Sequence, residues 1–128
     1  MFAILLFTTT VFSQDVAATS NDDAYHKVEL YFGLTANGKK ITQKKWQQFV
    51  AGYITSAFPE GLTIVNAYGQ WRTDEGAVLK EGSRIVILVC RRNAASEEKI
   101  AKIKDEYKKR FNQQSVLEVN ISTEKVVF

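Results

Sequence analysis

The spacing of hydrophobic residues changes along this chain in a fixed order, and that order restricts the fold more than any single motif does. Apolar residues at every second position are typical of half-buried strands, and those at three- and four-residue spacing are typical of amphipathic helices. The segments that show one spacing or the other are residues 28–34, 46–58, 62–72, 77–91, 96–112 and 116–122. Their order predicts β-α-β-β-α-β.

This order is the split βαβ arrangement of the ferredoxin-like fold, an α+β class in which two helices cover one face of a four-stranded antiparallel sheet. Turn residues lie where this arrangement needs them. Asn37 with the following glycine is a turn signal, Pro59 ends the first helix, and Gly76 lies in the short loop of the central hairpin. Residues 27–128 are therefore expected to form a single domain.

The first thirteen residues are mostly apolar and carry no charge. The run is shorter than the ~20 apolar residues that a membrane-spanning helix needs. It has the length of the apolar region of a signal peptide, and Val11 and Ser13 fit a cleavage site before Gln14. A buried N-terminal strand is the alternative interpretation. We predict a signal peptide over residues 1–13, a flexible leader over 14–26, and an exported protein, periplasmic or secreted, without a stable membrane anchor after cleavage.

The chain has one cysteine, Cys90, which excludes a disulfide within the chain. Cys90 ends an apolar run, and a buried, unreactive thiol is its expected state. A nucleophilic cysteine would need a nearby base, and the single histidine, His26, falls in the expected leader. The sequence contains no glycine-rich phosphate loop, no metal-ligand cluster and no Ser/His/Asp arrangement. It therefore predicts no metal site and no cofactor.

One face of the sheet is left uncovered in this fold, and alternation along the strands indicates which side chains lie on it. We expect Trp71 and the residues of the same parity to pack under the helices, together with Leu117, Val119 and Ile121. The residues expected on the uncovered face are Glu29, Tyr31, Asn66, Tyr68, Gln70, Arg72, Val116, Glu118, Asn120 and Ser122. The third strand, residues 77–91, is apolar on both faces.

The contents of the uncovered face support two interpretations. The apolar third strand needs a cover, which a homodimer interface would provide. Alternatively, five side chains converge on a small polar or anionic ligand. They are Glu29, Tyr31, Gln70, Arg72 and Arg84. Arginine offers a fork of donors that matches carboxylates and phosphates, while glutamine and tyrosine orient the ligand.

Several short motifs run through the chain in unbroken order. They are LYFGL at 30–34, Trp46 with Phe49, FPxGLT at 58–63, GQWR at 69–72, Ser83 with Arg84, and Tyr107 with Phe111 followed by QSV at 114–116. Together they resemble the DUF3574 family over residues 28–128. The resemblance implies a small, mostly bacterial, exported or lipoprotein-like domain of unknown function, and it implies no catalytic residues. No lipobox cysteine is seen.

Our hypothesis from the sequence is an exported, non-catalytic α+β domain that self-associates or binds a small polar or anionic ligand on its uncovered sheet face. The alternative is an enzyme acting on a small anionic substrate. In that case Tyr31 or Glu29 transfers a proton, and Arg72 with Arg84 binds the anion. A nucleic-acid-binding module of this topology would need aromatic residues on the central strands. Residues 85–90 contain none, so no nucleic-acid partner is expected.

Overall fold

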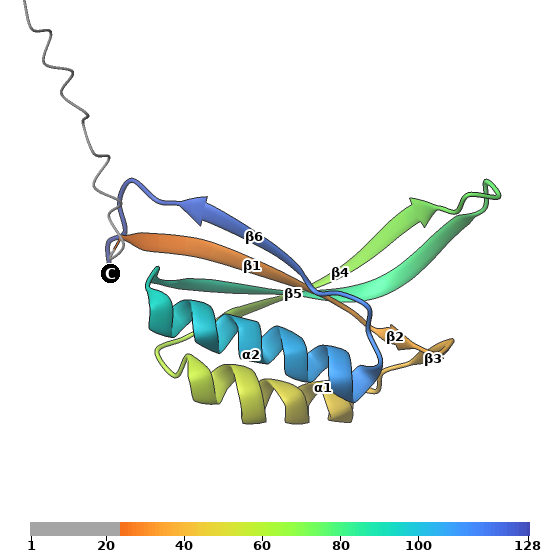
Figure 1. Cartoon of the computed structure of the whole chain (residues 1–128), viewed down its shortest axis with the longest axis horizontal. Coiled ribbons are helices and arrows are strands. Elements are labelled where there is room, and N and C mark those ends of the chain that lie inside the picture. The colour runs from red at the N-terminus through yellow and green to blue at the C-terminus, as the bar shows by residue number, and fades with distance from the viewer. Residues whose placement is uncertain (1–23) are drawn as a thin grey trace, which may run out of the picture.

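A computed structural model describes residues 24–128 of the chain (Figure 1). The elements in chain order are β1 (Tyr25–Gly33), β2 (Thr35–Ala36), β3 (Lys39–Lys40), α1 (Gln43–Phe49), η1 (Val50–Thr55), β4 (Thr63–Arg72), β5 (Val78–Arg91), α2 (Ala94–Phe111) and β6 (Leu117–Ser122). The predicted signal peptide and cleavage site lie outside the described residues. The predicted leader was set too long, because Tyr25 and His26 already belong to β1.

The four long strands form one sheet in the order β4-β5-β1-β6, and each neighbouring pair is antiparallel. Both helices lie on the same side of this sheet (Figure 1). The predicted ferredoxin-like arrangement is therefore confirmed. One addition is the small hairpin of β2 and β3, which turns at Asn37 and Gly38. Both residues have positive φ angles, 51° and 73°, as the turn of a two-residue hairpin requires.

The core lies between the sheet and the helices. Alternate residues of β1 (Val28, Leu30 and Phe32) are fully buried on the helix side. Five aromatic rings from β1, α1 and α2 pack together in this core; they are Phe32, Trp46, Phe49, Tyr107 and Phe111. The hydroxyl of Tyr107 donates a 2.6 Å hydrogen bond to the carbonyl of Gly33, which ties α2 to the end of β1.

Both helices begin at the polar residues that end their preceding loops. Thr42 accepts a hydrogen bond from the backbone N–H of Lys45 at 3.3 Å and is the N-cap of α1. Asn93 and Ser96 form a reciprocal capping box at the start of α2. Asn112 ends α2 in the left-handed conformation with φ of 47°. The first helix is regular only to Phe49, and its second half, η1, is a π-helix.

The hairpin of β4 and β5 extends beyond the helix layer as a twisted arm (Figure 1). Its register is continuous from the pair Thr63–Ile87 to the pair Arg72–Val78. Because no helix lies under the distal half, most residues of the arm are exposed on both faces. The arm is therefore held by backbone hydrogen bonds and cross-strand contacts rather than by the core.

The register corrects our assignment of faces for the second and the last strand. Ile64 pairs with the buried Val86, so Ile64, Asn66, Tyr68, Gln70 and Arg72 lie on the helix side of the sheet. Their neighbours, including Trp71, lie on the uncovered side.

The same inversion applies to β6. Glu118 pairs with the buried Leu30, and its carboxylate forms a 2.8 Å ion pair with Lys104 of α2. Asn120 and Ser122 share this helix side, and Val116 is buried in the core rather than placed on the uncovered face. Leu117, Val119 and Ile121 are therefore directed away from the helices.

Candidate functional site

The five residues predicted to form one ligand site lie in three separate places. Glu29 and Tyr31 are on the uncovered face of β1, as predicted. Arg84 pairs with Phe32 and lies on the helix side of β5. Gln70 and Arg72 lie on the helix side of the arm. Arg72 is six positions along β4 from Asn66, the residue opposite Arg84. At ~3.3 Å per residue this separates the two arginines by about 20 Å. They cannot clamp one anion, so the proposed enzyme site is wrong in its geometry.

We call the uncovered side of the sheet the open face. Its apolar residues come from three of the four strands, and they are exposed or only half-buried. They are Val65 and Trp71 in β4, Leu79, Ile85, Ile87 and Val89 in β5, and Leu117, Val119 and Ile121 in β6. Only the central strand β1 contributes mainly polar groups to the middle of this face.

A small polar cluster occupies that middle position. Glu29 forms an ion pair with Lys27 at 2.7 Å and accepts a hydrogen bond from the hydroxyl of Tyr31 at 2.6 Å. The hydrogen bonds from Lys27 and Tyr31 hold the pKa of Glu29 below its usual value. The bond to Glu29 raises the pKa of Tyr31. At neutral pH the cluster therefore consists of one anion, one cation and a neutral phenol, with no net charge.

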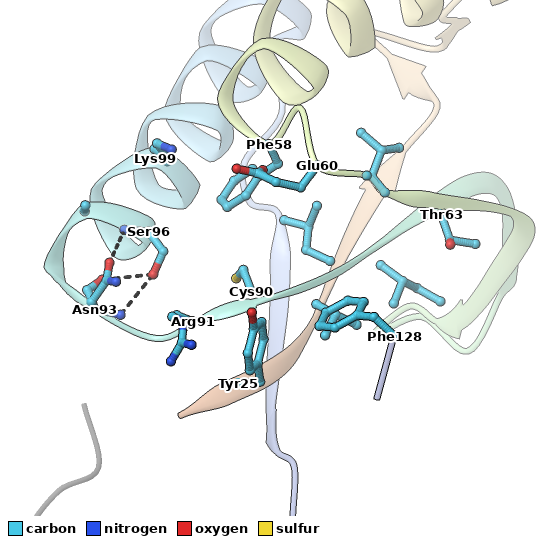
Figure 2. A pocket seen from close by; sticks show the side chains of 16 residues that line it. Tyr25, Phe58, Glu60, Thr63, Cys90, Arg91, Asn93, Ser96, Lys99 and Phe128 are labelled. Atoms are coloured by element: carbon cyan, nitrogen blue, oxygen red, sulfur yellow. Dashed lines mark hydrogen bonds between the residues drawn. The ribbon is translucent and has the colours of Figure 1, made fainter. Parts of the chain in front are cut away.

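A hollow of about 930 Å³ lies at the end of the sheet where β4 begins (Figure 2). It opens there because the pairing of β4 with β5 stops at Ile87, whereas β5 continues to Arg91. The ammonium of Lys99 lies 5.4 Å from the ring centre of Phe58. On the other wall the ring of Phe128 meets that of Tyr25 edge-on at 5.7 Å. These four residues of the hollow's lining therefore already contact other side chains of the protein.

Cys90 lines this hollow, and the structure places His26, the single histidine of the sequence, beside it. His26 is the cross-strand partner of Cys90, and both face the helix side. Burial raises the pKa of the Cys90 thiol, so the thiol is protonated at neutral pH. Within residues 24–128, Nδ1 of His26 has no hydrogen-bond partner. The pair therefore lacks the activated thiolate that nucleophilic catalysis needs.

The proximity of His26 to Cys90 was missed from the sequence. The first strand was predicted to begin at Val28, which left His26 in the leader. Its burial on the same face as Val28 and Leu30 extends the alternation of β1 toward the N-terminus. That alternation, His26-x-Val28-x-Leu30, was the available signal.

Known proteins resemble this chain in sequence and in fold. The family model described as "Protein of unknown function (DUF3574)" matches residues 27–128. The chain belongs to the DUF3574 family. Membership confirms the resemblance found in the motifs, and it assigns no activity. No curated protein matches this DUF3574 chain.

Two solved structures share the fold of the DUF3574 domain. A phage SAM lyase in complex with S-methyl-5′-thioadenosine aligns with a TM-score of 0.58 and 15% identity, over 82% of this chain and 95% of that chain. The apo state of a phage SAM lyase aligns with a TM-score of 0.52 and 15% identity, over 84% and 96% of the two chains. At this identity the likeness concerns the fold alone, since one fold supports many functions.

Two further observations concern the described part of the DUF3574 chain. None of its helices has both the length and the apolar character to cross a membrane. Residues 24–128 also contain no group of three or more histidine, cysteine, aspartate or glutamate side chains that could hold a metal ion.

Proposed function

We propose that this DUF3574 protein is an exported domain that works as a dimer, in which the open faces of two sheets pack against each other. The observation that carries the proposal is the composition of the open face. Seven apolar side chains from β4, β5 and β6 flank the polar cluster of β1, and two more, Trp71 and Leu79, lie farther out on the arm. Contiguous exposed apolar surface of this kind is uncommon on monomeric proteins and is typical of interfaces.

The charge distribution supports a second copy of the chain as the partner. In a twofold dimer the same surface contacts itself, so a face with one sign of charge would repel its copy. The charges at the centre of the open face cancel, because Lys27 and Glu29 form an ion pair. Tyr31 also satisfies the second oxygen of the Glu29 carboxylate. This cluster therefore enters a dry interface with its charges already partnered.

A small ligand on the open face is less well supported than self-association. The carboxylate of Glu29 is already held by Lys27 and Tyr31, and the surrounding side chains are aliphatic. Arg72 and Arg84, which would have bound an anion, lie on the other side of the sheet. The face therefore offers area for a protein partner and few free polar groups for a small molecule.

Light scattering of the purified protein tests the dimer. We expect a mass twice that of the single chain, which is 14.5 kDa for the full sequence, at micromolar protein concentrations. The dimer should persist at high salt because its core is apolar and its ion pair is internal to each subunit. A monomer at about 100 μM protein would contradict the proposal.

Export is supported by the uncharged, mostly apolar residues 1–13 and by the small residue at Ser13. When the full chain is produced in a bacterial host, we expect it in the periplasm or the medium with Gln14 as its first residue. Mass spectrometry of the recovered protein gives the cleavage position. Recovery of the intact chain, beginning at Met1, from the cytoplasm would show that no signal peptide is removed.

A further inference from the structure

A second hollow lies on the opposite side of the sheet from the proposed dimer interface. It is an open hollow with a volume of about 260 Å³, lined by residues of α1, η1, β4 and β5. The residues that matter for its chemistry are Gln43, Trp46, Val50, Ile64, Asn66 and Arg84. The helices and the strands therefore each contribute both apolar and amide side chains, and the guanidinium comes from β5.

Among the described residues 24–128, Arg84 is the only charged one in this lining, and none of their carboxylates forms an ion pair with it. Arg84 is half-buried as a residue, and its guanidinium donates to the backbone carbonyl of Ser83 at 3.2 Å and to Oε1 of Gln43 at 3.3 Å, the latter in an exposed contact. Both acceptors are neutral. None of the ion pairs within residues 24–128 includes Arg84. A guanidinium has five N–H donors, so that of Arg84 keeps donors available for a ligand. Its positive charge has no ion-pair partner among the described residues.

The surrounding structure holds this group in place. Arg84 belongs to the central hairpin strand and lies directly opposite Asn66 in β4. Cross-strand neighbours on one face have Cβ atoms about 5 Å apart, so the Asn66 amide can contact the same ligand atoms as the guanidinium. Trp46 is buried in the aromatic core and also lines the hollow. The recognition groups are thus set on strands rather than on mobile loops.

The wall formed by the first helix is also unusual. Val50, Ala51 and Thr55 line the hollow and belong to the π-helix η1. A π-helix is rare, and where one interrupts an α-helix it is frequently found at a functional site. Here the irregular turn lies over the same hollow that contains the uncompensated Arg84.

We propose that this hollow binds the carboxylate of a small molecule with a short apolar body. The guanidinium of Arg84 would donate hydrogen bonds to the two carboxylate oxygens, because its planar fork of N–H groups matches their geometry. Asn66 would donate to the same group, and Ile64 with Val50 would pack against the hydrocarbon part. The volume lies below the ~300–1,000 Å³ of sites for drug-sized ligands. The ligand is therefore limited to a chain of a few carbons or a single ring.

Calorimetric titration of the full chain with hexanoate and benzoate tests this assignment. We expect dissociation constants on the order of 1 mM for ligands of this size. Hexanamide and benzamide, which have the same shape without the charge, should bind at least tenfold more weakly. Inorganic phosphate, tested at the same ionic strength, should also bind at least tenfold more weakly because it has no apolar part.

Two variants connect the binding to Arg84. Arg84→Gln should weaken hexanoate binding at least tenfold, and Arg84→Lys should weaken it too because lysine lacks the fork. Arg72→Gln is the matched control, since Arg72 lies on the same side of the sheet but outside the hollow. It should bind as the wild type does. Thermal unfolding of each variant verifies that it is folded.

Several outcomes would overturn the proposal. One is the absence of carboxylate binding at 10 mM ligand, and another is equal binding by Arg84→Gln. Phosphate binding as strong as that of hexanoate would exclude the apolar-bodied class. If Arg84→Gln fails to fold, NMR spectra of the wild-type protein with hexanoate still test the proposal. Hexanoate must then shift the backbone amide signals of Ala51, Ile64 and Asn66 in NMR spectra, and shifts confined to other residues would place the ligand elsewhere.

Discussion

Lysine in place of both Val65 and Leu117 is expected to convert the proposed dimer into a monomer. The two residues lie on the open face in β4 and β6, on either side of the polar cluster of β1. They are 39% and 58% exposed in the single chain, so a lysine at either position can extend its charged end into water there. In the dimer the same charges would be buried without partners, which is strongly unfavourable.

We expect the dissociation constant of this double variant to rise at least 100-fold, which corresponds to about 2.8 kcal/mol. Light scattering over a dilution series measures the change. The matched control is Tyr68→Lys combined with Val78→Lys. These two residues are also exposed and apolar and lie in the same hairpin, but on the opposite face. The control should stay dimeric. A dimeric Val65/Leu117 variant, or a monomeric control, would show that the interface is not the open face.

Alanine in place of Phe49 is expected to have the largest effect on stability. Phe49 is completely buried, and its ring lies within about 6 Å of five other rings. They belong to Phe32, Trp46, Tyr53, Tyr107 and Phe111. Removing a buried phenylalanine costs the transfer free energy of the ring plus the free energy of the cavity, about 3–5 kcal/mol in total. That is a large share of the 5–15 kcal/mol by which such domains are stable.

Urea unfolding followed by circular dichroism measures this loss as a lower midpoint at unchanged slope. Phe128→Ala is the control, because it deletes the same side chain at a position that is 95% exposed. Its effect should stay within about 0.5 kcal/mol. All proteins are compared at one concentration, since a dimer is stabilised by mass action. A Phe49→Ala protein as stable as the control would mean that the aromatic cluster is not the centre of the core.

The order of elements could be predicted from the sequence because each element follows a simple physical requirement. The two helices bury one stripe of apolar residues, such as Ile100, Ile103 and Tyr107 of α2, and the stripe repeats with the helical period. β1 alternates between buried and half-buried residues. Pro59 ends the helical region before β4, and Thr42 caps its start. These are local requirements, and they do not depend on which other elements lie nearby.

The faces of β4 and β6 could not be predicted in the same way. In β6, Leu117, Val119 and Ile121 are the apolar set, and they were assigned to the core. They instead lie on the open face, because that face is itself apolar, while Glu118 is directed to the helix side by its ion pair with Lys104. Alternation separates the two sides of a strand but does not identify the one that the helices cover.

The prediction of the faces of β4 was wrong for a second reason. Its distal half, which includes Gln70 and Trp71, belongs to the arm beyond the helix layer. No burial selects the residues of either side there, so Trp71 gave a misleading signal. The predicted ligand site depended on the same assignment of faces. The pairing of Ile64 with Val86 places Gln70 and Arg72 on the helix side, away from Glu29 and Tyr31. Arg84 remains a candidate because its neighbours in the second hollow come from α1, η1 and the helix side of β4, and none of them lies on the open face.

The position of β1 between β5 and β6 has a consequence for biosynthesis. His26 pairs with Ser122 near the other end of the chain, so the sheet cannot be completed until the last strand has left the ribosome. Contacts between residues so far apart in sequence also form slowly. The edge strand β6 is therefore the last part of the sheet that can form, after β4, β5 and β1 have been synthesised.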